Sequence, residues 1–373
     1  MLPYDNKLQG RMDTMVGEER GKNVANNDLH GKPITIVGAG AIGGTIGAYL
    51  ADAGYHVTLV DSAPEHVEAI RERGLRITGV RGEQSFHPKV VLAEEMEGPL
   101  SVTFLCVKGH FTGTAMEQIA PLLGPEGYVL SLQNGLNEAL IAGRIGAERT
   151  VGAFVHFGAD LLEPGLIQLG YEETIHVGEL DGRITPRVEA LRETLEHAMP
   201  TRVTDNIWGF LWGKLVFGAL GFLVSCVDAP VAEIIDDPLG RRLCRATCTE
   251  AYLVARTQVE RIEPIGEFEP EKFAPGEDME SRADETLTAL ADSWRSSIKQ
   301  HMGIWRDLKV KKRKTEVDMQ VAQIVATGRE GGVPTPVNAA VLEIVHELED
   351  GMRGMKWANL QEIAHRSEVS LRG

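Results

Sequence analysis

A lysine stands near the middle of the most apolar stretch of this chain. Residues 207–227 read IWGFLWGKLVFGALGFLVSCV, and Lys214 is the only charged residue among them. An ammonium group among apolar side chains is costly unless it is paired or used in chemistry. Hydride addition to a ketone builds negative charge on oxygen, and an ammonium stabilises that charge and can deliver the proton. Lys214 is therefore a candidate general acid, with a purely structural role as the alternative.

A carboxylate opposite such an ammonium would pair with it and fix its position. Glu316, in the stretch KTEVD, is one of the carboxylates later in the chain. The alternative is that Glu316, which follows Thr315 at the start of a predicted helix, only stabilises the helix dipole.

A glycine loop near the N-terminus predicts a dinucleotide site. The residues GAGAIG lie between the strand-like run ITIV and a helix of small residues. The expected cofactor contacts are Gly38, Gly40, Ala41, Ile42 and Gly43. The first glycine allows the tight turn, the second lets the backbone approach a pyrophosphate, and the third lets the helix pack on the strand. The helix N-terminus then offers free N–H groups to the phosphates. A glycine-rich turn without a ligand is the alternative.

An acidic residue at the end of the second strand indicates which dinucleotide is bound. Asp61 closes the run YHVTLVD, 18 residues after Gly43, and the following SAPE contains no arginine. A carboxylate there accepts hydrogen bonds from the ribose hydroxyls and repels a 2′-phosphate. The sequence therefore favours NAD over NADP. Capping of the next helix by Asp61 is the alternative.

The elements around these residues divide the chain in two. Strand-like runs alternate with helical segments up to about residue 203, which predicts a mostly parallel sheet covered by helices. We therefore expect a Rossmann-type α/β dinucleotide-binding domain over 31–203 and an all-α domain for substrate binding and dimerisation over 204–348. A polar N-terminal extension (1–30) and a C-terminal tail (349–373) are expected to flank them. The predicted helices of the second domain span 207–227, 239–259, 284–311, 315–327 and 338–348.

Composition and charge narrow the class of protein. The chain has 373 residues and a formal net charge of -16, which argues against nucleic acid as a partner. Its four cysteines are too few for a disulfide framework and, with no further ligands nearby, form no convincing metal site. The polar first 30 residues lack the apolar core of a secretory signal. A cytoplasmic protein with reduced thiols is expected.

The length of the apolar segment 207–227 also matches a membrane span. A lysine at mid-span would add roughly 2.5–3.5 kcal/mol to the free energy of insertion. A helix that is apolar on every side is equally expected at the centre of a large helical domain. We therefore expect a core helix and no membrane partner.

Several stretches, in the right order, resemble the ketopantoate reductase (2-dehydropantoate 2-reductase) family. They are VGAGAIGG, CVKGHFT, LQNGLNE, VGAFVHFGADLLEPGLIQLG followed by HVGELDG, WGKL, KTEVD and GVPTPVN. The resemblance covers about residues 33–348. It implies that Val107, Lys108 and Asn134 line the cofactor side of the cleft, with Asn134 close to the substrate as well. It also implies that Lys214 acts beside the substrate carbonyl, and that Glu316 holds Lys214 or a substrate hydroxyl.

The chain departs from this family at the substrate clamps. Asparagines recur one and two helical turns after the lysine in the family, whereas Gly218 and Phe222 stand here. The family's serine-rich motif is replaced by HMGIWRDL, with Gly303 near the serine position. His301 and Arg306 are candidates to replace the lost contacts, with surface or packing roles as the alternative. We expect a more apolar pocket and a bulkier or less hydroxylated substrate than ketopantoate.

The predicted function is interconversion of a 2-oxo acid, or a related ketone, with its alcohol by an NAD(P)-dependent oxidoreductase. The substrate is a small keto or hydroxy compound, and a homodimer is compatible with the two-domain plan. Two alternatives use the same frame: an imine-reducing or opine-type dehydrogenase, and a non-catalytic nucleotide-sensing protein. Retention of Lys214 and Glu316 argues against the non-catalytic alternative.

Overall fold

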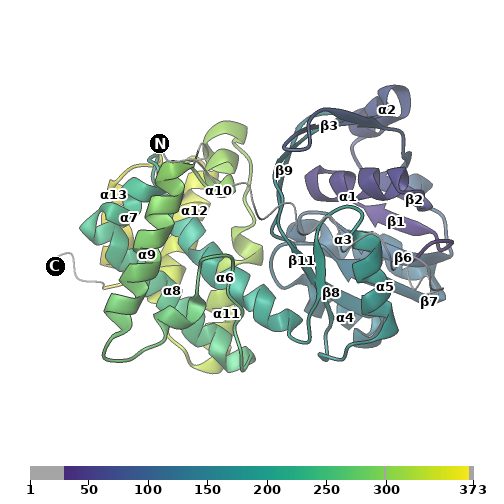
Figure 1. Ribbon diagram of the computed structural model, residues 1–373. Helices are drawn as coiled ribbons and strands as arrows, with labels where there is room; N and C mark the ends of the chain where they lie inside the picture. The colour runs from purple at the N-terminus through teal and green to yellow at the C-terminus, as the bar shows by residue number, and fades with distance from the viewer. Residues whose placement is uncertain (1–28, 298–299, 369–373) are drawn as a thin grey trace, which may run out of the picture.

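The structure, a computed structural model, describes residues 29–297 and 300–368 and forms an α/β part and a helical part, side by side (Figure 1). An eight-stranded sheet organises the first part, in the order β12-β11-β8-β7-β6-β1-β2-β5. β11 runs antiparallel to β8 and carries β12 parallel to itself; the other neighbours are parallel. The strands are β1 (Ile34–Val37), β2 (Val57–Asp61), β5 (Lys89–Leu92), β6 (Leu100–Leu105), β7 (Leu123–Ser131), β8 (Thr150–Phe154), β11 (Ile175–Glu179) and β12 (Thr201–Val203).

Helices cover both faces of this sheet, because its central strands are apolar on both sides. One face packs against residues of α1 and α5, such as Ile46 and Leu191; the other packs against Met116 of α3 and Ile141 of α4. The helices of this part are α1 (Ala41–Asp52), α2 (Pro64–Arg73), α3 (Thr112–Ile119), α4 (Asn137–Ile145) and α5 (Pro186–Leu195). The predicted Rossmann-type domain is confirmed.

A second sheet lies over α1, in the order β4-β3-β10-β9 (Figure 1). Its strands are β3 (Leu75–Gly79), β4 (Gln84–Phe86), β9 (Gly158–Glu163) and β10 (Leu166–Tyr171). β9 and β10 form a hairpin within the stretch VGAFVHFGADLLEPGLIQLG. β3 is one of the strand-like runs before residue 203, but it pairs with β10 and β4 and does not join the parallel sheet. Pairing partners so distant in sequence are not encoded in local periodicity.

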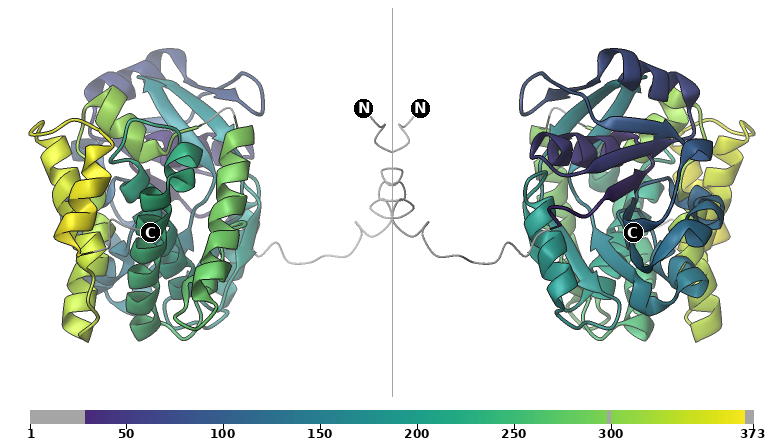
Figure 2. Two further views of the ribbon diagram at one scale, coloured as in Figure 1. Left: turned by 90° about the vertical axis from the view of Figure 1, so that its left-hand side faces the viewer. Right: turned by 90° about the vertical axis from the view of Figure 1, so that its right-hand side faces the viewer.

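The helical part is built around α6 (Ile207–Val224), and Figure 2 shows it from its outer face on the left and the α/β part on the right. The other elements are α7 (Val231–Asp236), α8 (Pro238–Gln258), α9 (Met279–Ser296), α10 (Gly303–Arg306), a π-helical turn (Asp307–Lys311), the 3-10 turn η8 (Val317–Met319), α11 (Val321–Gly331), α12 (Pro336–Glu349) and α13 (Ala358–Arg366). α6 is long and apolar enough to cross a membrane, yet 72% of it is buried inside the protein. It is the expected core helix.

Three predicted elements of the helical part differ from the structure. The helix expected over 315–327 starts only at Val321, because the backbone before it forms the 3-10 turn η8. The continuous helix expected over 284–311 is interrupted: α9 ends at Ser296, and α10 starts only at Gly303. Between them the carbonyl of Gln300 accepts the Val231 N–H at the start of α7, so the backbone there serves another helix. The expected C-terminal tail contains α13, whose Leu360 and Ile363 are buried against the helical core. Their spacing on one face of a short helix explains the packing.

Candidate active site

The glycine loop between β1 and α1 is built for close backbone approach. Gly38 has φ +98°, and a Cβ there would lie 2.8 Å from the carbonyl carbon of Cys106. A Cβ at Gly43 would lie 2.1 Å from the Gly38 carbonyl oxygen. Around Gly40, by contrast, a Cβ would have no atom within 4 Å. The first and third glycines are therefore needed for packing, and the second leaves its outer side open.

The N-terminus of α1 is open to an anion. Gly40 is the N-cap and supplies no side-chain hydrogen bond to the first turn, where Ala41 and Ile42 begin the helix. First-turn N–H groups and the helix dipole together attract phosphate oxygens. The loop and the helix start therefore fit the pyrophosphate of a dinucleotide.

Asp61 fastens the glycine loop to the end of β2. One carboxylate oxygen accepts the Ala39 N–H at 2.8 Å, and the other accepts the Ala63 N–H at 3.0 Å. Ala63 is the N-cap of α2, so Asp61 also supports the start of that helix, as the alternative role proposed. Each carboxylate oxygen keeps further acceptor capacity for a ribose hydroxyl.

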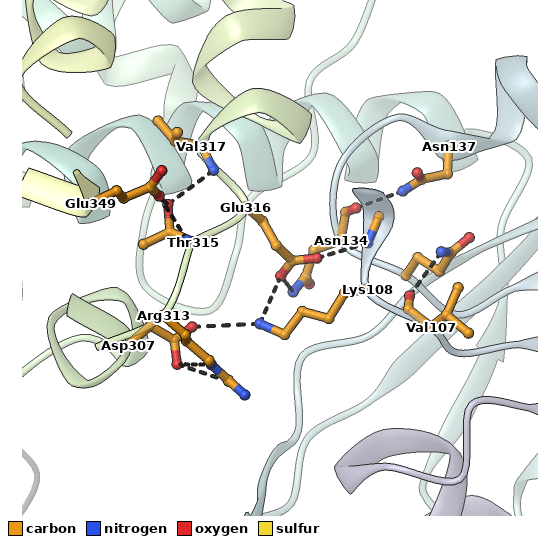
Figure 3. A network of polar contacts seen from close by, with 12 residues as sticks. Val107, Lys108, Asn134, Asn137, Asp307, Arg313, Thr315, Glu316, Val317 and Glu349 are labelled. Atoms are coloured by element: carbon orange, nitrogen blue, oxygen red, sulfur yellow. Dashed lines mark hydrogen bonds and ion pairs between the residues drawn. The ribbon is translucent and has the colours of Figure 1, made fainter. Parts of the chain in front are cut away.

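Glu316 crosses from the helical part to the α/β part (Figure 3). Its carboxylate accepts the Gly109 N–H at 3.1 Å and the Asn134 side-chain N–H at 3.2 Å, and it pairs with the Lys108 ammonium at 3.6 Å. Lys108 also lies 3.5 Å from the carboxylate of Asp307. The described ion pairs thus join Glu316 to Lys108, not to Lys214 as the family resemblance allowed. With a side chain 9% exposed, this carboxylate fastens the two parts together.

The backbone around Glu316 is held by its neighbours (Figure 3). The Thr315 N–H and hydroxyl donate to the Glu349 carboxylate at 2.7 and 2.6 Å, and the Val317 N–H donates to the Thr315 hydroxyl at 3.2 Å. The Thr315 hydroxyl, rather than the Glu316 carboxylate, therefore accepts the first N–H group of η8. This leaves the Glu316 carboxylate free to reach the other domain, and the helix-dipole alternative is not what its contacts indicate.

Lys214 reaches the end of the neighbouring strand β8. Its ammonium donates a hydrogen bond to the carbonyl of Val155, directly after β8, and lies 5.3 Å from the ring centre of Phe154. Burial lowers the pKa of Lys214 to about 8, and the negative charges of Glu316 and Glu138 oppose that shift. A lysine that titrates near neutral pH can both give and take a proton.

The pKa of Lys214 predicts opposite pH dependences for the two directions of a carbonyl–alcohol reaction. As the proton donor in reduction, Lys214 must be an ammonium, so kcat/KM is expected to fall as the pH rises through about 8. Oxidation needs the neutral amine, so its kcat/KM should rise over the same interval. Initial rates between pH 6 and 10 in both directions measure this. Parallel profiles would remove Lys214 from the proton transfer.

Only some of the predicted substrate residues lie near Lys214 or Glu316. Asn134 lies in the Glu316 network, and Gly218 follows Lys214 by one turn of α6. Phe222 has 0% exposed surface and packs in the core of the helical part, so the prediction that it lines the cleft is corrected. His301 stacks on Trp305, with ring centres 4.0 Å apart, beside the far end of α6.

The remaining predicted contacts are also accounted for. Gly303 is exposed, and a Cβ there would have no atom within 4 Å, so the structure does not bring it to Lys214. Arg306 forms an ion pair with Asp160 of β9, and so joins the two parts rather than contacting Lys214. The Val107 carbonyl accepts the Gln133 side-chain N–H at 2.8 Å, next to the glycine loop.

Sequence reasoning missed four contributors to this site. Gly109 and Asp307 bind members of the Glu316 network, Val155 holds the Lys214 ammonium, and Gln320 lies beside Gly218. Gly109 and Val155 act through backbone atoms, so their side chains give no sign of the contact. Asp307 approaches Lys108 from a segment 199 residues further along the chain, which a local pattern does not reveal. Glu138 is a further buried carboxyl near Lys214, and burial raises its pKa to about 7.

The strand order explains why these residues meet. The glycine loop, Lys108, Asn134 and Val155 follow the adjacent strands β1, β6, β7 and β8 at one edge of the sheet. In an open α/β sheet, ligands bind outside the carboxyl ends of the strands, where the strand order reverses. Here the helical part delivers Lys214 and Glu316 to that edge.

Comparison with known proteins agrees with this arrangement. The family profile described as ketopantoate reductase PanE/ApbA matches residues 34–182, and the profile of its C-terminal domain matches residues 206–349. The chain belongs to the ketopantoate reductase family. Membership makes it an NAD(P)-dependent dehydrogenase of the 2-hydroxy acid type.

Individual relatives of this ketopantoate reductase family member cover most of its length. A 2-dehydropantoate 2-reductase of Mesorhizobium japonicum is 31% identical over 343 residues, 84% of this chain and 97% of the relative. One from Archaeoglobus fulgidus is 29% identical and covers 86% and 98%. The structure of D-mandelate dehydrogenase with NADH and anilino(oxo)acetate shares the fold, with a TM-score of 0.74, 24% identity and coverage of 86% and 99%.

Proposed function

We propose that this enzyme transfers hydride between a nicotinamide dinucleotide, NAD(H) by preference, and the carbonyl carbon of a 2-oxo acid. Lys214 carries the proposal: its ammonium lies at the strand edge that also holds the glycine loop, and its pKa is about 8. The carbonyl oxygen of the substrate then takes a proton from Lys214 as negative charge develops on it. When bound, the nicotinamide supplies the hydride.

The protein groups around Lys214 prepare it for this step. The Val155 carbonyl accepts one ammonium hydrogen, which leaves the other hydrogens for the substrate oxygen. The Glu316 carboxylate acts on Lys214 through its charge and on the α/β part through its hydrogen bonds to Gly109 and Asn134. After the proton has left, Lys214 is a neutral amine that regains a proton from solvent.

A substrate screen tests the proposed reaction. NADH oxidation is followed with a panel of 2-oxo acids that includes ketopantoate, and NAD reduction with the matching 2-hydroxy acids. Turnover of at least one 2-oxo acid, lost in the Lys214→Ala variant, is expected. Turnover only after an amine is added would instead support the imine-reducing alternative, and binding of NADH without any turnover would support a sensing protein.

The choice of dinucleotide follows from Asp61. A carboxylate at the end of β2 repels the 2′-phosphate of NADP, so we expect kcat/KM to be about tenfold or more higher with NADH than with NADPH. Asp61→Asn removes the charge and keeps a hydrogen-bond acceptor, so this ratio should shrink towards one. Steady-state kinetics with both cofactors measure it. Equal use of both by the wild type would contradict this role of Asp61.

The cellular location and the oligomeric state of the enzyme are also proposals. We infer a cytoplasmic location, supported by four cysteines that are all free thiols. We also infer a homodimer, supported by the likeness in fold to a dimeric ketopantoate reductase from Staphylococcus aureus. Size-exclusion chromatography with light scattering measures the oligomeric state.

A further inference from the structure

Ala39, the residue between the first two glycines of the loop, is held by both its N–H and its carbonyl. The N–H donates to the Asp61 carboxylate at 2.8 Å, and the carbonyl oxygen lies 2.9 Å from the Nε2 atom of His66. His66 belongs to the first turn of α2 and is only 2% exposed. Gly44 leaves room for this carbonyl, since a Cβ there would lie 2.6 Å from the Ala39 oxygen. Ala39 is therefore fixed from two elements, β2 and α2.

The second contact of His66 shows which of its ring nitrogens carries the hydrogen. The Gly165 N–H, in the turn between β9 and β10, donates to the Nδ1 atom at 3.0 Å. Nδ1 is therefore an acceptor, and the hydrogen is on Nε2, which donates it to the Ala39 carbonyl. Only the neutral ring with this tautomer satisfies both partners. His66 thus links the glycine loop to the second sheet through two buried hydrogen bonds.

The contact with His66 also sets the direction of the Gly40 N–H. The Ala39 carbonyl and the Gly40 N–H belong to one planar trans peptide unit, in which the two groups point in opposite directions. His66 holds the carbonyl, so the N–H points away from His66. Within residues 29–297 and 300–368 this N–H takes part in no hydrogen bond, and a Cβ at Gly40 would have no atom within 4 Å. It is a free backbone donor at the open side of the loop.

We propose that His66 is a positioning residue of the cofactor site, which turns the Gly40 N–H towards the pyrophosphate of the nicotinamide dinucleotide. The inference rests on the part of the proposed function that places a dinucleotide at the glycine loop. A phosphate oxygen there also meets the first-turn N–H groups of α1. Without the contact to His66, the peptide unit between Ala39 and Gly40 can rotate. The affinity for the cofactor then falls in proportion to the fraction of molecules that keep the donating orientation.

Two substitutions separate the two contacts of the His66 ring. The amide of asparagine ends near the position of Nδ1, so His66→Asn keeps an acceptor for Gly165 and loses the donor to Ala39. The longer amide of glutamine reaches the position of Nε2, so His66→Gln keeps that donor and loses the acceptor. We expect His66→Asn to raise the Kd of NADH about fivefold, the effect of one neutral hydrogen bond. His66→Gln should keep the Kd within about twofold of the wild type.

Fluorescence titration gives these Kd values without turnover, and the same titration with NADPH covers either cofactor preference. Thermal unfolding without cofactor separates stability from binding: each variant loses one buried hydrogen bond, so their Tm values should fall by similar amounts. His87→Asn makes the same exchange at an exposed position of the α/β part and should change neither Kd nor Tm. If both variants weakened NADH binding alike, or neither did, His66 would have a structural role only.

A second measurement needs no variant and so remains informative if His66→Asn does not fold. In the wild type, hydrogen exchange of the Gly40 N–H should be fast without cofactor and slowed when NADH is bound, whereas Ala39 is protected in both states. Unchanged exchange at Gly40 would overturn the role of His66. A wild type that binds NADH but reduces no 2-oxo acid refutes the proposed reaction alone, and one that binds neither NADH nor NADPH overturns both proposals.

Discussion

Replacement of Lys214 by alanine is expected to lower kcat about 1,000-fold in either direction of the reaction, since it removes the proton donor together with its charge. The affinity for NADH should stay within about twofold of the wild type, because the proposed cofactor contacts, the glycine loop and Asp61, belong to the α/β part and not to α6. Stopped-flow turnover and NADH fluorescence titration measure the two quantities separately.

Two further variants separate the roles of this lysine. Lys214→Arg keeps a positive charge but cannot give up a proton at neutral pH, so it should recover only the electrostatic part of the lost rate. Lys356→Ala, at an exposed position outside the cleft, is the matched control and should leave kcat unchanged. A Lys214→Ala enzyme with wild-type kcat would refute the proposed chemistry.

Replacement of Glu316 by glutamine is expected to lower kcat/KM about 100-fold, because the change removes the negative charge that faces Lys108 and weakens the acceptor of the Gly109 and Asn134 N–H groups. An amide at this position also turns a donor towards Asn134 or Lys108. The negative charge of Glu316 raises the pKa of Lys214. Its removal should therefore move the midpoint of the reductive pH profile from about 8 to a lower pH.

Asp307→Asn is the control for that experiment. Asp307 approaches the same ammonium of Lys108, at 3.5 Å, but has no contact with Gly109 or Asn134. We expect less than about a threefold change in kcat/KM and no shift of the pH profile, as for a half-exposed ion pair. If the two variants behaved alike, Glu316 would act only through Lys108.

Local patterns in the sequence were enough for the α/β part and its glycine loop. The three glycines, the β-branched runs and Asp61 follow one another within 30 residues, so their geometry is set by neighbours along the chain. Lys214 could also be singled out from its neighbours along the chain, because it is the only charged residue in the apolar segment 207–227. The helix α13 was not predicted, because the residues around it are mostly polar. The i, i+3 spacing of Leu360 and Ile363 is nevertheless typical of an amphipathic helix.

The contacts across the cleft could not be predicted in this way. Glu316 meets Gly109 from 207 residues away, and no spacing rule connects them. α6 is apolar on every side, so periodicity does not tell that Lys214 reaches Val155 and Gly218 lies beside Gln320 while Phe222 packs in the core. The partnership of Gly218 with Gln320 depends on how two helices approach each other, which only the tertiary structure reveals.

The most direct test is the structure of a ternary complex with NADH and a non-reactive 2-oxo acid analogue. A distance of about 2.7–3.2 Å from the Lys214 nitrogen to the carbonyl oxygen of the analogue is expected, as for a hydrogen bond. An ammonium turned to bulk water, or a carbonyl bound out of its reach, would contradict the assignment of Lys214 as the proton donor.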